Sequence, residues 1–264
     1  MRILLPPSEA KLPGGRGRPI GNRPGPLEQP RQQVLHALTE LLPDPVAAAE
    51  ALQLPPSVAE AALGMNRAVA TGPTMPALRR YTGIVYAGLD LPGLSAKARQ
   101  LANQRLLIFS GLFGVLRATE PVPGYRVPSA AVLPGLGIAA TFWRKQLSGP
   151  LAEPLAGLLG QRGPIVDLRS TDYAAMWQPA PGSSQSRRLL IVRVLSRRPG
   201  GDYGVISYQS KLAKGRLAAV LLERAADGRP VRGPDDLQAA WTELGGTGAE
   251  GRPQRLGLAL DLYE

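Results

Sequence analysis

Short, continuous apolar runs recur along the chain, each bounded by polar residues, glycine or proline. Such runs are typical of strands that are buried on both faces. They predict six strands, at residues 2–5, 106–109, 164–168, 189–195, 204–207 and 256–262. Because segments with helical apolar spacing separate most of them, the pattern predicts one α/β domain over residues 1–264, with a mixed central sheet and flanking helices.

A helical insertion is expected at about residues 31–104, between the first two strands. Apolar spacing predicts helices at 32–42, 46–54 and 57–70, and Ser57 followed by Glu60 has the spacing of a capping box. Further helices are expected at 76–81 and 95–103. Later in the chain the pattern predicts helices at 139–159, 207–226 and 235–244, with a glycine-rich loop at 245–251.

The segment 81–90 joins two of the inserted helices and contains Gly83 and Gly88. A helix, a glycine-containing hairpin and a second helix form the arrangement of helix-hairpin-helix DNA-binding modules. In such a module glycines let the backbone approach a phosphate, which the amides of the following helix bind. Lys97 and Arg99 add positive charge to that helix. A plain corner between two helices has the same pattern, so both interpretations stay open.

Composition places the chain among globular proteins: 44% of its 264 residues are hydrophobic and 19% are charged. Its apolar runs are too short to span a bilayer, and the N-terminal run ends at Pro6, too early for a signal peptide. We therefore expect a cytoplasmic protein that does not bind membranes.

The chain has no cysteine and a single histidine, His36. The absence of cysteine excludes disulfides, thiolate nucleophiles and thiol-based redox sensing, and one histidine argues against zinc sites and histidine-based triads. No metal or cofactor is expected. Any chemistry falls to Asp, Glu, Lys, Arg, Tyr, Ser or Thr.

The chain is strongly basic. Its 31 Lys and Arg residues against 20 Asp and Glu give a formal net charge of +11. Such a charge favours a polyanionic partner, because neutralised phosphates release counterions. It is also compatible with a solubilising surface.

Polar residues gather directly after the predicted strands. Ligands in open α/β sheets usually bind beyond the carboxyl ends of strands, so these residues are expected to line one basic cleft. The candidates are Glu9 and Lys11; Ser110, Arg117, Tyr125 and Arg126; Ser170, Asp172 and Tyr173; and Lys211 and Lys214. Lys211 and Lys214 crowd the start of a helix, where the dipole disfavours cations, and a bound anion relieves this conflict.

Several strings occur in one order along the chain: a first strand whose exit loop carries Lys11, then TGIVYAGL, SGLFGVLR, PGYR, Phe142-Trp143 and SYQSKLAKG. Together they resemble the signature of the YaaA family of peroxide stress resistance proteins. Ser170 and Tyr173 match a family string of the form Ala-Ser-x-Glu-Tyr, with Asp172 at a neighbouring polar position, and Lys214 stands where the family has arginine. The resemblance implies an α/β fold with a positively charged cleft, a helix-hairpin-helix element, DNA binding and protection against hydrogen peroxide.

Two functional hypotheses follow. The first is a DNA-binding protein of the peroxide stress response that limits oxidative damage to DNA and protein and binds duplex or branched DNA. The alternative is an enzyme acting on a small anionic or nucleotide-like substrate, with Lys211 as nucleophile or proton carrier and Glu9 or Asp172 as its partner. A basic scaffold without cleft chemistry is a third possibility.

Overall fold

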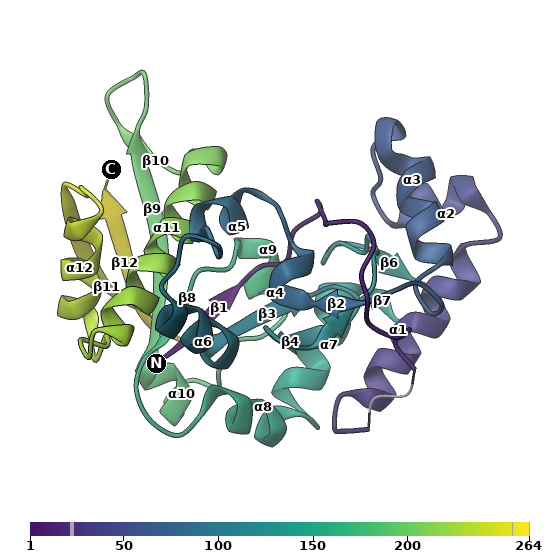
Figure 1. Cartoon of the computed structure of the whole chain (residues 1–264), viewed down its shortest axis with the longest axis horizontal. Helices are drawn as coiled ribbons and strands as arrows, with labels where there is room; N and C mark the ends of the chain where they lie inside the picture. Colours follow the sequence, from purple (N-terminus) through teal and green to yellow (C-terminus); the bar gives the residue numbers. More distant parts are fainter. Residues whose placement is uncertain (22–23, 255, 264) are drawn as a thin grey trace.

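A mixed sheet forms the centre of the molecule (Figure 1). The computed structural model describes residues 1–21, 24–254 and 256–263. Within them the sheet has eight strands in the order β11-β12-β9-β8-β1-β3-β4, with β10 paired to β9. The strands are β1 Arg2–Leu5, β3 Leu106–Ser110, β4 Gly114–Arg117, β8 Ile165–Asp167, β9 Leu189–Arg197, β10 Tyr203–Gly204, β11 Gly248–Gln254 and β12 Gly257–Tyr263.

The central strands are parallel and buried on both faces. β1 pairs with β3 on one side, where Ile3 lies opposite Leu106, and with β8 on the other, where Ile3 lies opposite Val166. β8, β9 and β12 continue the parallel pairing, and β4 and β11 close the two edges in antiparallel pairing. Continuous apolar runs suit these strands because no face of them meets water.

Helices and two small two-stranded sheets surround the central sheet. Figure 1 shows α1, α2 and α3 at one end of the long axis and α12 at the other. The helices are α1 Glu28–Leu41, α2 Pro45–Ala51, α3 Pro56–Arg67, α4 Ala77–Arg80, α5 Ile84–Leu89, α6 Ala96–Arg105, α7 Ala139–Ser148, α8 Ala152–Leu159, α9 Thr171–Ala174, α10 Ser184–Arg188, α11 Ser207–Ala226 and α12 Pro234–Glu243. Two small antiparallel sheets pair β2 Met75–Pro76 with β5 Pro121–Val122, and β6 Val132–Leu133 with β7 Gly137–Ile138.

The predicted fold class is confirmed: the molecule is a mixed α/β domain with a central sheet and flanking helices. Three local predictions are wrong. The glycine-rich segment 245–251 leads into the edge strand β11 instead of remaining a loop, because it pairs with β12. The strand predicted at 204–207 is displaced, because β10 covers only Tyr203–Gly204 and helix α11 begins at Ser207. Ser57 does not cap α3, which begins at Pro56 with Pro55 in the cap position and no side-chain cap bond.

The predicted glycine hairpin at 81–90 is also wrong, because residues 84–89 form helix α5. α5 packs closely on α11 through two glycines. A Cβ on Gly88 would lie 2.3 Å from the Leu212 carbonyl oxygen, and a Cβ on Gly215 would lie 2.0 Å from the Val85 carbonyl oxygen. The glycines therefore permit contact between two helix backbones.

The strand order creates a topological switch point at the centre of the sheet. After β1 the chain places β3 on one side of it, and then returns to place β8 on the other. In open α/β sheets the crevice beyond the carboxyl ends of such diverging strands is the usual ligand site. The loops that follow β1 and β8 start at this crevice.

A membrane-spanning role has no support in the helices. Among the residues that the structure describes, no helix combines the length and the apolar character needed to cross a bilayer.

Candidate functional site

The loop after β1 is held firmly over the carboxyl edge of the sheet. The Tyr86 hydroxyl donates to the Pro6 carbonyl at 2.8 Å, and the backbone of Lys11 forms an antiparallel bridge with Tyr81. The buried guanidinium of Arg80 donates to four carbonyl groups, two of them on this loop: those of Leu12, Gly14, Pro73 and Val122. The loop therefore presents Lys11 in a fixed position.

The Lys11 ammonium lies among aromatic rings. It donates to the Ser8 carbonyl at 2.7 Å and lies 4.3 Å from the centre of the Tyr125 ring and 5.5 Å from that of Tyr81. Burial lowers the pKa of the Lys11 amine to about 8; nearby Glu9 opposes this shift, and the guanidinium groups of Arg126 and Arg80 add to it. A substantial fraction of this amine is neutral slightly above neutral pH.

A chain of three buried hydroxyls lies beside Lys11. The hydroxyls of Tyr81 and Tyr125 are 2.6 Å apart, and that of Tyr125 is 2.7 Å from the Ser110 hydroxyl. Ser110 also accepts a bond from the Phe113 amide at 3.1 Å. Three hydroxyl hydrogens serve two links, so one hydrogen of the three is left for a further acceptor.

Burial keeps the phenols around this chain protonated. It raises the pKa of Tyr81, Tyr86, Tyr125 and Tyr173 above the ordinary tyrosine value. The negative charge of Glu9 adds to the shift for Tyr125 and Tyr173. Tyr173 enters the cluster from α9, after β8, so residues from three strand exits meet here.

An ion pair borders the cluster. The Arg126 guanidinium lies 3.2 Å from a carboxylate oxygen of Glu9, and both side chains are partly exposed. Asn66 on α3 fixes the Arg126 backbone, accepting from its amide at 2.8 Å and donating to its carbonyl at 3.0 Å. Glu9 and Arg126 are therefore brought together as predicted, but they neutralise each other.

A second buried lysine, Lys214, lies after β8. Its ammonium donates to the Arg169 carbonyl at 3.0 Å, and burial lowers its pKa to about 8 although Asp167 opposes the shift. Asp167 and Arg169 form a buried ion pair with contacts of 2.9 and 2.7 Å. Burial alone would raise the pKa of Asp167, but the charge and hydrogen bonds of Arg169 hold it below the usual value.

The remaining predicted residues lie after β8 and at the start of α11. Ser170 occupies the cap position of α9 without a side-chain cap bond. Asp172 and Lys211 are exposed.

The prediction for Arg117 is wrong. β3 and β4 form an antiparallel hairpin that pairs Arg117 with Leu107 near the start of β3. Arg117 therefore lies toward the amino end of the central strands, where its charge helps to lower the pKa of Arg2, after the larger effect of burial. The hairpin carries it away from Tyr125 and Arg126.

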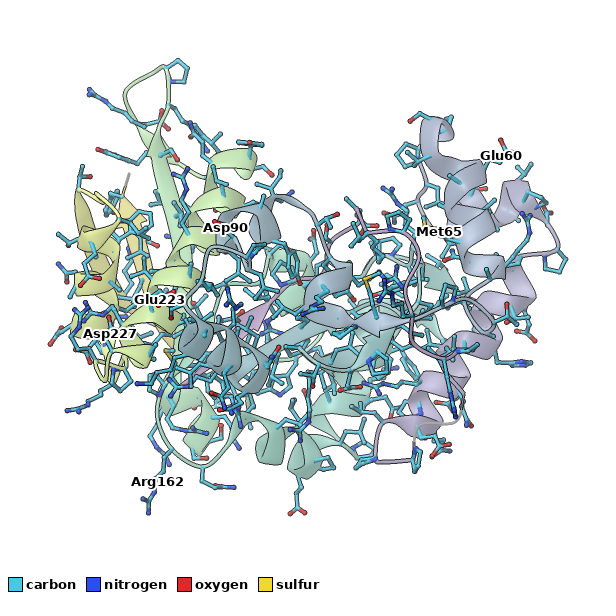
Figure 2. The ribbon with its side chains drawn as sticks, in the orientation of Figure 1. Glu60, Met65, Asp90, Arg162, Glu223 and Asp227 are labelled. Atoms are coloured by element: carbon cyan, nitrogen blue, oxygen red, sulfur yellow. The ribbon has the colours of Figure 1, made fainter. Side chains whose placement is uncertain are left out.

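The predicted phosphate site at the start of α6 is also wrong. A carboxylate already occupies it: Glu223 of α11, labelled in Figure 2, accepts from the Ser95 amide and the Ser95 hydroxyl, each at 2.7 Å. Arg99, on α6, donates to the carbonyls of Pro92 and Leu94 in the loop before this helix, and Lys97 is exposed. Gly83 lies against Ser8, and Gly88 against α11.

An exposed basic groove lies between β9 and α11. It has a volume of about 390 Å³ and is lined by Ser196, Arg197, Gln209, Leu212, Ala213 and Arg216. The nearby side chains of Tyr208 and Tyr203 are 61% and 46% exposed. Figure 1 shows the β9–β10 turn extending away from the body of the molecule.

Sequence reasoning missed several residues that build the site. Tyr86 stood within the string TGIVYAGL, so the resemblance contained that signal. Asp167 was visible as a charge inside an otherwise apolar strand, which indicates a buried partner. Asn66, Arg80 and Tyr81 gave no such signal, because distant segments determine their roles.

Metal ligation has no support in the side-chain clusters. Within residues 1–21, 24–254 and 256–263 no group of three or more His, Cys, Asp or Glu side chains is placed to hold a metal ion.

The fold and these clusters define an α/β protein whose titratable groups collect at the carboxyl edge of a central parallel sheet. A family model described as peroxide stress protein YaaA matches residues 1–242. A UPF0246 protein of Streptomyces coelicolor is 38% identical over 251 residues, which cover 93% of this chain and 90% of the relative. A UPF0246 protein of Corynebacterium glutamicum is 35% identical over 225 residues, 84% of each chain. The chain belongs to the YaaA family of peroxide stress proteins, which confirms the resemblance seen in the sequence.

Proposed function

We propose that this peroxide stress protein binds DNA through the basic groove between β9 and α11. The observation that carries the proposal is the groove itself, where Arg197 and Arg216 are exposed and the exposed ring of Tyr208 lies nearby. Cations that track phosphates and aromatic faces that stack on bases are the two features of a nucleic-acid surface. The net charge of +11 supports the same partner.

This location replaces the helix-hairpin-helix site. The start of α6 already binds the carboxylate of Glu223 through Ser95, so a phosphate there meets a like charge. The groove of β9 and α11 is the better candidate because its two arginines are exposed on neighbouring elements.

The test is a binding titration of duplex, branched and single-stranded DNA at several salt concentrations. We expect the variant Arg197→Ala/Arg216→Ala to bind more weakly and to flatten the plot of log affinity against log salt by about 2, since each lost phosphate contact contributes about 0.9. The matched control Lys97→Ala/Arg99→Ala removes the same charge from α6. Equal loss in both variants would argue against a defined groove and for diffuse attraction by net charge.

A second candidate function is an enzyme acting on a small anionic substrate. The two buried amines of Lys11 and Lys214 at the carboxyl edge favour it, with Lys11 in the role first assigned to Lys211. Thermal unfolding in the presence of small anionic metabolites tests it, because a ligand that binds the folded state raises the unfolding temperature. We expect Lys11→Met to abolish the increase and Lys211→Met to retain it.

A further inference from the structure

We propose that Lys11 forms an imine with a small 2-oxo acid. The inference rests on the second candidate function and is independent of DNA binding. It stands on three features of the described residues: the position of the Lys11 amine, the hydroxyl chain beside it, and the ion pair at its border.

The first feature is the scarcity and placement of lysine. The chain has five lysines among its 31 basic residues, so arginine supplies most of its positive charge. Lys97, Lys145 and Lys211 are exposed, whereas Lys11 and Lys214 lie at the carboxyl edge of the sheet. Lysine differs from arginine in that it can release its proton and act as a nucleophile. Burial lowers the pKa of the Lys11 amine to about 8, which supports this role.

The second feature is the proton supply. The hydroxyls of Tyr81, Tyr125 and Ser110 form a chain with contacts of 2.6 and 2.7 Å, and the chain retains one hydrogen for a further acceptor. The Lys11 ammonium lies directly over the Tyr125 ring, at 4.3 Å from its centre. Tyr125 therefore links the two groups: its ring lies beneath the Lys11 amine and its hydroxyl belongs to the chain.

The third feature is a charged group for the carboxylate of the ligand. Arg126 is held by Asn66 through its backbone, and its guanidinium pairs with Glu9, whose side chain is 42% exposed. A ligand carboxylate replaces the Glu9 carboxylate without changing the charge beside Arg126. We expect the ketone or aldehyde carbon next to that carboxylate to lie beside the Lys11 amine, whose pKa already responds to the charge of Arg126.

The reaction balances without a further reagent. The neutral amine attacks the carbonyl carbon, a carbon–nitrogen bond forms, and the carbonyl oxygen takes up a proton. The nitrogen gives up its two protons in turn, the carbon–oxygen bond breaks as the second proton reaches the leaving oxygen, and water departs. One amine and one carbonyl compound give one imine and one water, with no oxidation or reduction.

Reductive trapping tests the proposal on the intact protein. The wild-type chain is incubated with glyoxylate and cyanoborohydride between pH 7 and pH 9, and the modification rate of each lysine is read by peptide mass spectrometry. We expect Lys11 to react at least about tenfold faster than Lys97, Lys145 and Lys211, which serve as internal controls in the same folded molecule. Equal or slower reaction at Lys11 overturns the proposal.

Lys214 is the sharper control, because its pKa is also lowered to about 8 but its ammonium donates to the Arg169 carbonyl. Equal rates at Lys214 and Lys11 would mean that reactivity follows the lowered pKa alone, and would overturn the assignment of this site. Tyr125→Phe keeps the ring and breaks the hydroxyl chain, and we expect it to slow trapping at Lys11 about tenfold.

A parallel measurement separates this proposal from the function on which it rests. Glyoxylate without reductant should raise the unfolding temperature of the wild type, and Arg126→Gln should abolish the increase. An increase without trapping at Lys11 overturns the imine and leaves a small-anion site. If glyoxylate produces neither the increase in unfolding temperature nor trapping at Lys11, the imine proposal is overturned. That result also counts against glyoxylate as a ligand of the site.

Discussion

Lys11 and Lys214 lie at the same edge of the sheet, and burial lowers the pKa of each to about 8, yet their surroundings differ. Lys11 lies on a loop over two tyrosine rings, beside a hydroxyl chain in which one hydrogen is available for a further hydrogen bond. Lys214 lies on a long helix, bonded to a backbone carbonyl and next to the closed ion pair of Asp167 and Arg169. A lowered pKa alone therefore does not distinguish a reactive lysine from one that fixes a helix to a loop. The groups that surround each lysine make that distinction.

The strongest test of this contrast removes the ion pair beside Lys214. Asp167→Asn leaves the buried Arg169 guanidinium without its counter-charge, and we expect the free energy of unfolding to fall by about 3–5 kcal/mol. Urea denaturation measures the loss. The control Asp172→Asn changes an exposed carboxylate of α9 and should stay within about 0.5 kcal/mol of the wild type. Similar losses in the two variants would contradict a structural role for the Lys214 region.

The pH dependence of stability addresses both lysines together. Their pKa falls to about 8 in the folded protein and returns to the ordinary value of 10.5 on unfolding, so the unfolded chain binds more protons between pH 8 and pH 10. Stability should therefore rise over this interval. Above pH 10 it should fall, since unfolded tyrosines ionise there while the buried ones, whose pKa is raised, do not.

Urea denaturation at each pH measures this profile. The double variant Lys11→Met/Lys214→Met should lose the rise between pH 8 and pH 10, and each single variant should lose part of it. A rise of the same size in the double variant would assign the effect to other groups.

The smallest loss of stability is expected from a substitution in the hydroxyl chain beside Lys11. Tyr125→Phe removes the partner of both Tyr81 and Ser110, which leaves buried polar atoms with fewer bonds, and we expect a loss of about 1–3 kcal/mol in the free energy of unfolding. Urea denaturation measures this loss in the free energy of unfolding. Tyr208→Phe, at the exposed start of α11, is the matched control. A neutral Tyr125→Phe variant would show that the chain contributes little to stability and weaken the contrast with the ion pair of Asp167.

The sequence predicted the sheet better than it predicted the site. Continuous apolar runs located β1, β3, β8, β9 and β12, because burial on both faces leaves a local pattern. It also placed Ser110, Tyr125 and Lys11 near one another, since all three follow neighbouring strand ends. The predicted position of Arg117 was wrong because a tight hairpin reverses the chain after Ser110. The pattern of apolar residues does not give the direction of a short edge strand.

The glycines of α5 show a second limit. Gly83 and Gly88 suggested a backbone that approaches phosphate, but the backbone that Gly88 approaches belongs to α11. A glycine signals close approach without naming the partner. The same holds for Ser95 and Glu223, where a carboxylate from a distant helix occupies the position that the local pattern offered to an anion.

The position of β1 determines when this edge can assemble during synthesis. β1 leaves the ribosome first, but it lies between β3 and β8, whose residues Leu106 and Val166 pair with the same Ile3. Until β8 emerges, at least one hydrogen-bonding edge of an apolar strand stays open, a condition that invites pairing with other chains. The Lys11 loop is bonded to α5 through Tyr86 and Pro6, and α5 in turn packs on α11, which is synthesised later. In a nascent chain this edge of the sheet can therefore assemble only after β8, Ile165–Asp167, has emerged, and α5 gains the support of α11 only after Ser207–Ala226 has followed.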